Sequence, residues 1–156
     1  MPPRVTHRSY LLLGLSLALL CCLACGPGKR KLYPVRGKVL CEGVPAEGAI
    51  VTLHALDASQ PMDQVPSARV QADGSFAIGT YEPADGAPPG DYKGIIIWLP
   101  PDALARISPT GRLPNKLPDL YSDAKTTPLN IHVNEGPNDL PPYDLPSSGS
   151  PKGGRR

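Results

Sequence analysis

Histidines, which most often carry acid–base or metal chemistry, are sparse in this chain of 156 residues. His54 and His132 lie in stretches where apolar and polar residues alternate, and each falls on the polar side of its stretch. Neither has the short spacing to a glutamate that a catalytic zinc site uses, and such a site keeps three protein ligands. The sequence therefore predicts surface histidines and no metal site.

Nucleophilic and carboxylate chemistry finds little support either. The chain has no Gly-x-Ser-x-Gly turn, and Cys41 has no histidine near it in the sequence to act as a base. Glu82 with Asp85, and Asp119 with Asp123, are pairs of acids in segments rich in Pro and Gly, which is typical of solvated turns. We expect no catalytic residues, no cofactor and no enzymatic activity. A hydrolase that uses these loop carboxylates is the alternative.

Cys25 carries the most specific chemical prediction. Arg4 and Arg8 precede an apolar run over residues 10–20, and small residues follow before Cys25. This order is typical of a secretory signal. A membrane-spanning helix needs about 20 apolar residues, and Gly26 ends this run before that length is reached. We therefore expect a signal peptide over residues 1–24.

The stretch Leu23-Ala24-Cys25-Gly26 resembles the lipobox of bacterial lipoproteins. The resemblance implies that a diacylglyceryl group is attached to the Cys25 thiol before cleavage after Ala24. Cys22 stands where the family prefers Leu, and it is the alternative acceptor; the small side chain of Ala24 at the cleavage point favours Cys25. Gly26 in place of Asp implies a lipid anchor in the outer membrane of the cell envelope.

Cleavage at this point changes the charge and thiol count of the chain. The sixteen basic residues include Arg4 and Arg8, so fourteen basic and fourteen acidic residues remain in the mature chain. A balanced charge without a long basic cluster argues against nucleic-acid binding. Cys41 is then the one thiol that is neither removed nor lipidated. We interpret it as a half-buried residue at the end of a strand; the alternative is a reactive thiol.

The mature chain consists of short β-type runs separated by turn residues, without a convincing helical pattern, so the predicted class is all-β. In residues 49–56, Ala49, Val51 and Leu53 share the expected core face. Asp73-Gly74 between β-forming runs predicts a hairpin. The expected strands are residues 35–40, 49–56, 69–71, 75–78, 92–99, 129–133 and 139–145, the last confined to a sheet edge by its prolines.

This reading divides the chain into four parts. After the signal helix of residues 1–24 comes a linker over residues 25–32. The β domain is expected over residues 33–145, with a Pro-rich surface excursion at 100–127 that has a weak helical tendency at 102–107. Residues 146–156 are rich in Ser, Gly, Pro and Arg, and we expect a disordered tail there.

Several turn and core residues of the domain occur in an order that is similar to that of a known protein family. They resemble the carboxypeptidase regulatory-like, transthyretin-like (prealbumin-like) domains, and the resemblance implies a seven-stranded Greek-key β-sandwich of a kind found in short bacterial lipoproteins. Because these positions form turns and core, they bear on the fold and not on chemistry. The matching residues are Gly37, Val39, Gly43, Pro45, Gly48-Ala49, Val51, Leu53, Asp73-Gly74, Phe76, Pro89-Gly90 and Tyr92.

The functional prediction that follows is a lipid-anchored binding module. Its loops at residues 57–68, 79–91 and 100–127 would face an envelope protein or glycan, because binding usually resides on loops of a rigid scaffold. An accessory domain that docks a secreted hydrolase and a carrier of a small ligand are the alternatives. The excursion also has a plain structural interpretation as a cover for the sandwich edge. The candidate binding residues are Tyr81, Leu113, Leu117, Leu120 and Tyr121.

Overall fold

The computed structural model of the chain describes residues 30–57, 64–111 and 113–149. The expected signal helix, Cys25 and the end of the predicted tail lie outside these residues. The chain divides into two units, residues 1–30 and residues 31–156, and the description below concerns the second. Within the described residues, no helix is both long enough and apolar enough to span a membrane.

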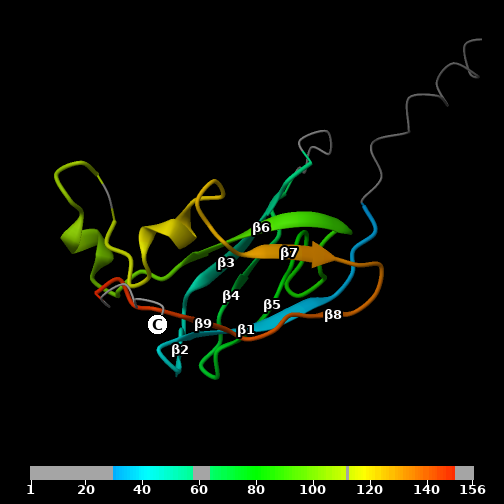
Figure 1. Cartoon of the computed structure of the whole chain (residues 1–156), viewed down its shortest axis with the longest axis horizontal. Coiled ribbons are helices and arrows are strands. Elements are labelled where there is room, and N and C mark those ends of the chain that lie inside the picture. Colours follow the sequence, from blue (N-terminus) through cyan, green and yellow to red (C-terminus); the bar gives the residue numbers. More distant parts are fainter. Residues whose placement is uncertain (1–29, 58–63, 112, 150–156) are drawn as a thin grey trace, which may run out of the picture. The chain divides into compact units, whose positions relative to one another are not determined.

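Two β-sheets make up the domain (Figure 1). In the first, β1 is the common partner of four shorter strands; in the second, the order is β4-β3-β6-β7. The described residues contain no α-helix, only two short 3-10 helices, which confirms the all-β prediction. The elements are β1 (Val35–Cys41), β2 (Val44–Pro45), β3 (Ile50–Ala55), β4 (Ser67–Arg69), β5 (Ser75–Ala77), β6 (Gly90–Ile97), η2 (Ala103–Arg106), η3 (Asp119–Ser122), β7 (Asn130–Val133), β8 (Asn138–Asp139) and β9 (Tyr143–Leu145).

The hydrophobic core follows the alternation of side chains along the strands. In β3, Val51 and Leu53 are buried, and in β7, Ile131 and Val133 are buried while the residues between them are exposed. These faces are the predicted ones. The larger buried side chains of the core are Val35, Val39, Val51, Leu53, Val70, Phe76, Ile78, Tyr92, Ile96, Leu117, Tyr121, Ile131, Val133 and Leu145.

The hairpin predicted around Asp73-Gly74 is present as a turn, but its two arms belong to different sheets. β4 pairs with β3, whereas β5 pairs with β1. The arms are joined near the turn, where Gln71 N donates to Ser75 O at 2.8 Å, and far from it, where Ser67 and Gly79 exchange two hydrogen bonds of 2.9 Å. They separate between these points because each arm completes the edge of its own sheet.

The C-terminal strands also differ from expectation. Residues 139–145 were predicted as one edge strand, but this region forms two short strands, β8 and β9, which both pair in parallel with β1 of the other sheet. Asn138 holds this crossover: its Oδ1 accepts Asn134 N at 2.8 Å and its Nδ2 donates to Gly136 O at 2.8 Å. The first residues of the tail predicted from residue 146 are hydrogen-bonded to the domain, since Ser148 N donates to Lys116 O at 2.8 Å.

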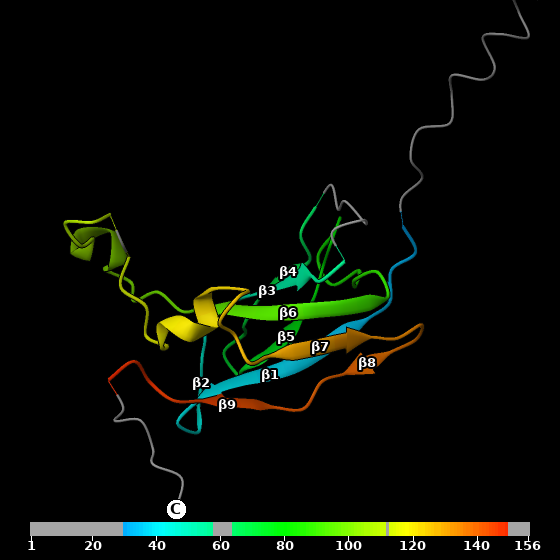
Figure 2. The same ribbon diagram turned by 45° about the horizontal axis from the view of Figure 1, so that its top comes forward.

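The N-terminal segment of the domain and the Pro-rich excursion lie at opposite ends of the β domain (Figures 1 and 2). Tyr33 pairs with Ala87, just before β6 begins at Gly90, and the excursion starts just after β6 ends at Ile97. The β6 strand has eight residues, and at about 3.3 Å per residue it separates the two ends by roughly 25 Å.

Candidate functional site

The predicted binding residues do not form one surface. Leu117 is fully buried and Tyr121 is 9% exposed, and both belong to the hydrophobic core. Leu113 and Leu120 are exposed, and Tyr81 is partly buried in a separate loop. Leu117 and Tyr121 therefore offer a partner almost no exposed side-chain surface. Their segment returns across the end of the β domain, and its buried apolar side chains belong to the core there.

The excursion is closed at its base by a clamp, which we define as Trp98, Asn115 and Lys116. Asn115 Oδ1 accepts Trp98 N at 3.0 Å, and Lys116 N donates to Trp98 O at 2.8 Å. The Lys116 ammonium lies 4.2 Å from the centre of the Trp98 ring, and the indole N–H donates to Glu47 O at 2.8 Å. These contacts fix the two ends of residues 99–114, the segment that we call the distal loop.

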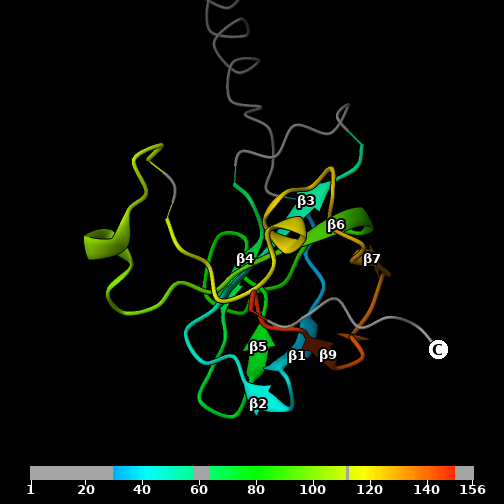
Figure 3. The same ribbon diagram turned by 60° about the vertical axis from the view of Figure 1, so that its left-hand side comes forward.

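The distal loop projects away from both sheets (Figure 3), and several of its apolar side chains are exposed. On η2, Ala103 is buried, but Leu104 is 79% exposed and Ile107, just after η2, is 47% exposed. Leu99 and Leu113 at the two limbs of the loop are exposed as well. Asp102 and Arg106 form an exposed ion pair of 3.5 Å within the loop. Sequence reasoning missed Leu104 and Ile107, although both lie in the stretch with a helical tendency.

A hollow beside η3 brings together side chains that are distant in the sequence. His54 on β3 and the carboxylates of Asp119 and Asp123 line an open space of about 880 Å³ over Ile95 of β6. Asp123 Oδ1 accepts Lys125 N at 2.8 Å, so this carboxylate also shapes its own turn. Within the described part of the chain, no three His, Cys, Asp or Glu residues are placed to hold a metal ion.

In the other acid pair, Glu82 and Asp85, the Asp85 carboxylate holds the backbone of its own loop. The Asp85 carboxylate accepts the N–H groups of Thr80 at 2.6 Å, Tyr81 at 3.1 Å and Glu82 at 2.9 Å. Partial burial raises the pKa of Asp85, but these three hydrogen bonds together outweigh it, so the pKa lies below the ordinary value of 3.8. Asp85 therefore stabilises the loop over residues 80–86.

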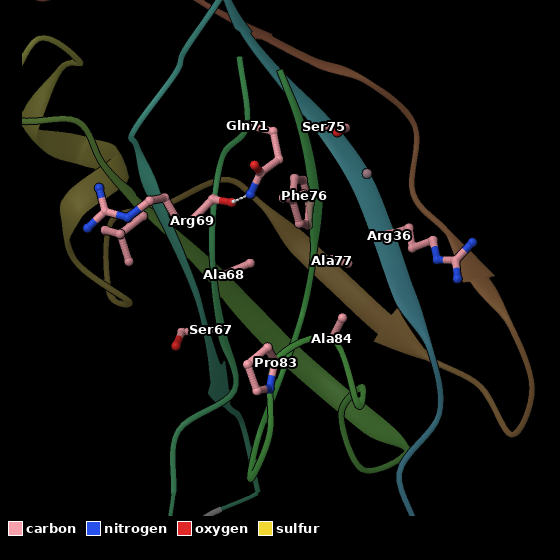
Figure 4. Close-up of a pocket in the computed structure, with 12 residues that line it drawn as sticks. Arg36, Ser67, Ala68, Arg69, Gln71, Ser75, Phe76, Ala77, Pro83 and Ala84 are labelled. Atoms are coloured by element: carbon pink, nitrogen blue, oxygen red, sulfur yellow. Dashed lines mark hydrogen bonds between the residues drawn. The ribbon is translucent and has the colours of Figure 1, made fainter. Parts of the chain in front are cut away.

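A second cavity, of about 580 Å³, lies where β4 and β5 separate (Figure 4). Phe76 and Ala68 contribute apolar surface to it, and Gln71 Nε2 donates to Arg69 O across one end at 3.3 Å. In Figure 4 the side chains of Arg36 and Arg69 point away from the opening. The cavity is thus mainly apolar and opens between the edges of the two sheets.

Cys41 is a buried free thiol at the last position of β1. Burial raises its pKa, and the nearby charges of Glu42 and Asp144 raise it further. A thiol reacts as a nucleophile in its thiolate form. The raised pKa favours the protonated form, in agreement with the predicted structural position.

Comparisons with known proteins do not assign the chain to a family. No family model matches it, and no curated protein matches it. Among solved structures, the crystal structure of a 9R-lipoxygenase from Cyanothece PCC8801 is similar, with a TM-score of 0.40 and 12% sequence identity. The match covers 90% of this chain and 21% of the lipoxygenase chain.

Proposed function

We propose that this chain is an exported, lipid-anchored and non-enzymatic β domain that holds its distal loop toward a protein partner in the cell envelope. The anchor is Cys25, by its resemblance to the lipobox cysteine, and the Gly after it favours the outer membrane. The two sheets support the finer proposal of a transthyretin-like sandwich. The fold serves to separate the anchored end from the binding end.

The observation that carries this proposal is the position of the exposed apolar residues relative to the N-terminal end of the domain. Tyr33 is attached beside the start of β6, and the distal loop follows the end of that strand. A lipid on Cys25, eight positions before Tyr33, would hold the first end near the membrane. The second end, with Leu104 exposed, would then face away from it.

The anchoring part of the proposal is tested by replacing Cys25 with Ser in the full-length chain. We expect the wild-type protein to sediment with membranes and the Cys25→Ser protein to be released in soluble form. Cys22→Ser is the matched control, and it should leave membrane attachment unchanged. Release of the Cys22→Ser protein, with the Cys25→Ser protein still attached, would move the anchor to Cys22.

The cavity between β4 and β5 favours a second candidate function, the carriage of a small ligand. Its volume of about 580 Å³ and its Phe76 surface suit a small molecule with an apolar body. A ligand that binds the folded domain raises its melting temperature by mass action. A thermal-shift screen of small amphipathic molecules tests this function. A hit should lose its effect in Ala68→Phe, a variant that fills the opening.

A further inference from the structure

We propose that the cavity between β4 and β5 binds a small, neutral molecule that has a terminal carboxamide and an apolar body. This inference rests on the second candidate function, the carriage of a small ligand, and it names the chemical class of that ligand. The carboxamide enters the gap between Arg69 and Ala77, and the apolar body lies against Phe76. The support comes from the hydrogen bonds of the two strands, the charge of the lining and the shape of the opening.

The hairpin that contains β4 and β5 is closed at both ends and open in the middle. Ser67 and Gly79 exchange two hydrogen bonds of 2.9 Å at one end, and Gln71 N donates to Ser75 O at 2.8 Å at the other. Between these closures the two described strands form no β-pair with each other, because β4 pairs with β3 and β5 pairs with β1. An extended peptide cannot run through a gap that is closed at both ends, so a ligand enters it with one end first.

The backbone groups of Arg69 and Ala77 face this gap. Along an antiparallel strand, the N–H and C=O groups of successive residues point to opposite edges. Ile78 N donates to Val35 O of β1 at 2.9 Å, so the residue before it, Ala77, turns its N–H and C=O toward β4. Val70 N donates at 2.8 Å to the residue before β3, so Arg69 turns its backbone groups toward β5. The gap thus offers both hydrogen-bond donors and acceptors to a ligand.

Gln71 shows which chemical group suits these backbone atoms. Its side chain ends in a carboxamide, and its Nε2 donates to Arg69 O at 3.3 Å at one end of the cavity. In a regular hairpin this carbonyl would accept the N–H of Ala77, but here it accepts a carboxamide of the chain itself. A carboxamide has both donors and an acceptor on one planar group. A second carboxamide, from a ligand, can therefore accept the Ala77 N–H and donate to Ala77 O.

The lining of the cavity favours a neutral ligand with an apolar body. Of the described residues that line it, Arg36 and Arg69 carry a charge, and both side chains point away from the opening (Figure 4). Apolar surface comes from Phe76 and Ala68 on the two strands and from Ala84 in the adjacent loop. The volume of about 580 Å³ is that of a site for a small molecule.

The opening is formed before a ligand binds. An added Cβ on Gly37 would lie 2.6 Å from Phe76 Cζ, so the Phe76 ring is seated over the bare backbone of this glycine. In the adjacent loop, Ala84 has a positive φ of 63°, which is unfavourable for a residue with a side chain. The Asp85 carboxylate fixes this loop through three N–H groups. A wall that is ordered in advance loses little conformational entropy on binding, which increases affinity.

The carboxamide site is tested by an NMR titration of the full-length Cys25→Ser protein, so that the result does not depend on the lipid anchor. The probes are 3-phenylpropanamide and its N,N-dimethyl derivative, which keeps the carbonyl group but lacks both N–H donors. We expect the primary amide to bind at least about fivefold more tightly, because the dimethyl amide leaves Ala77 O without a donor. The backbone amide signals of Arg69 and Ala77 should move most, and that of Gly79, which bonds to Ser67, should move less.

A variant of Gln71 separates the gap from the rest of the cavity. Gln71→Ala removes the carboxamide of the chain and frees Arg69 O for the ligand. The affinity for the primary amide should therefore rise by about twofold to tenfold, as expected for one added hydrogen bond, and the affinity for the dimethyl amide should not. Gln64→Ala, at an exposed glutamine outside the cavity lining, is the matched control and should change neither affinity. The melting temperature of each variant shows that it is folded.

Equal binding of the two amides, without movement of the Ala77 signal, would refute the carboxamide site and leave an apolar ligand cavity. Tighter binding of 3-phenylpropanoate would refute it as well, because the preferred head group would then be an anion. No binding of any of these probes to the folded protein would also refute it. A hit of another chemistry in the thermal-shift screen would in that case still support the carriage of a small ligand.

Discussion

Replacing Leu117 with Ala tests whether the limb that returns from the distal loop is part of the core. Leu117 is fully buried among the core residues. Removing a buried leucine side chain costs about 2–5 kcal/mol, because both transfer energy and a cavity contribute. For a domain of this size, one kcal/mol corresponds to roughly 3–5 °C in melting temperature. We therefore expect Leu117→Ala to melt about 6–25 °C below wild type.

Trp98 provides the assay, since it is the one tryptophan of the chain and belongs to the clamp next to Leu117. Its fluorescence during denaturation by urea gives the free energy of unfolding. Leu104→Ala is the matched control. Because Leu104 is 79% exposed, its replacement should change the stability by no more than about 0.5 kcal/mol. Equal destabilisation by the two variants would refute the assignment of Leu117 to the core and Leu104 to the surface.

Three further predictions concern single residues. Asp85→Asn should destabilise the domain at pH 7, because three N–H groups lose a charged acceptor. The difference in urea midpoint between wild type and variant should be complete above pH 3.8, the ordinary pKa of the carboxyl group. It should disappear as the pH falls through the lowered pKa of Asp85 in the folded state. Equal differences at pH 7 and pH 2 would contradict this. Gly86→Ala should lower the stability of the domain, because Gly86 has φ +104° and an added Cβ would collide with Tyr33 O. The Tyr33 and Ala87 amides, which bond to each other's carbonyl groups, should then exchange hydrogen faster. Unchanged protection of these two amides from exchange would contradict this. The buried thiol of Cys41 should react with an aromatic disulfide reagent only on unfolding, since its pKa is raised; rapid reaction of the folded mature protein would count against its burial.

The sequence predicts local features of this fold well because they depend on neighbouring residues. Alternation in residues 49–56 and 129–133 identifies the buried faces of β3 and β7 correctly. Gly74 does adopt a positive φ of 83°, as expected of a turn glycine. In each case the pattern and the structure involve the same few residues.

Long-range pairing could not be predicted in the same way. The turn at Asp73-Gly74 contains no information on which sheet each arm joins, and β5 pairs with β1 through residues more than thirty positions away. The same holds for β9, whose partner in β1 is about a hundred positions distant. Patterns within a few neighbouring residues do not identify such distant partners.

The candidate site depends on burial, and burial in a Pro-rich segment is not readable from periodicity. Leu104 and Leu117 are both leucines in the same excursion, yet one is exposed and the other fills the core. The prolines remove the regular spacing that would separate an inner from an outer side. The exposure of Leu104 and the burial of Leu117 therefore emerge only when the clamp and the core are known.

The N-terminal peptide of the mature protein, analysed by mass spectrometry, tests the central claim most directly. The account predicts a peptide that begins at Cys25 and carries a diacylglyceryl group on its sulfur. A peptide that begins at Met1, or an unmodified Cys25, would contradict the anchor and with it the orientation of the distal loop.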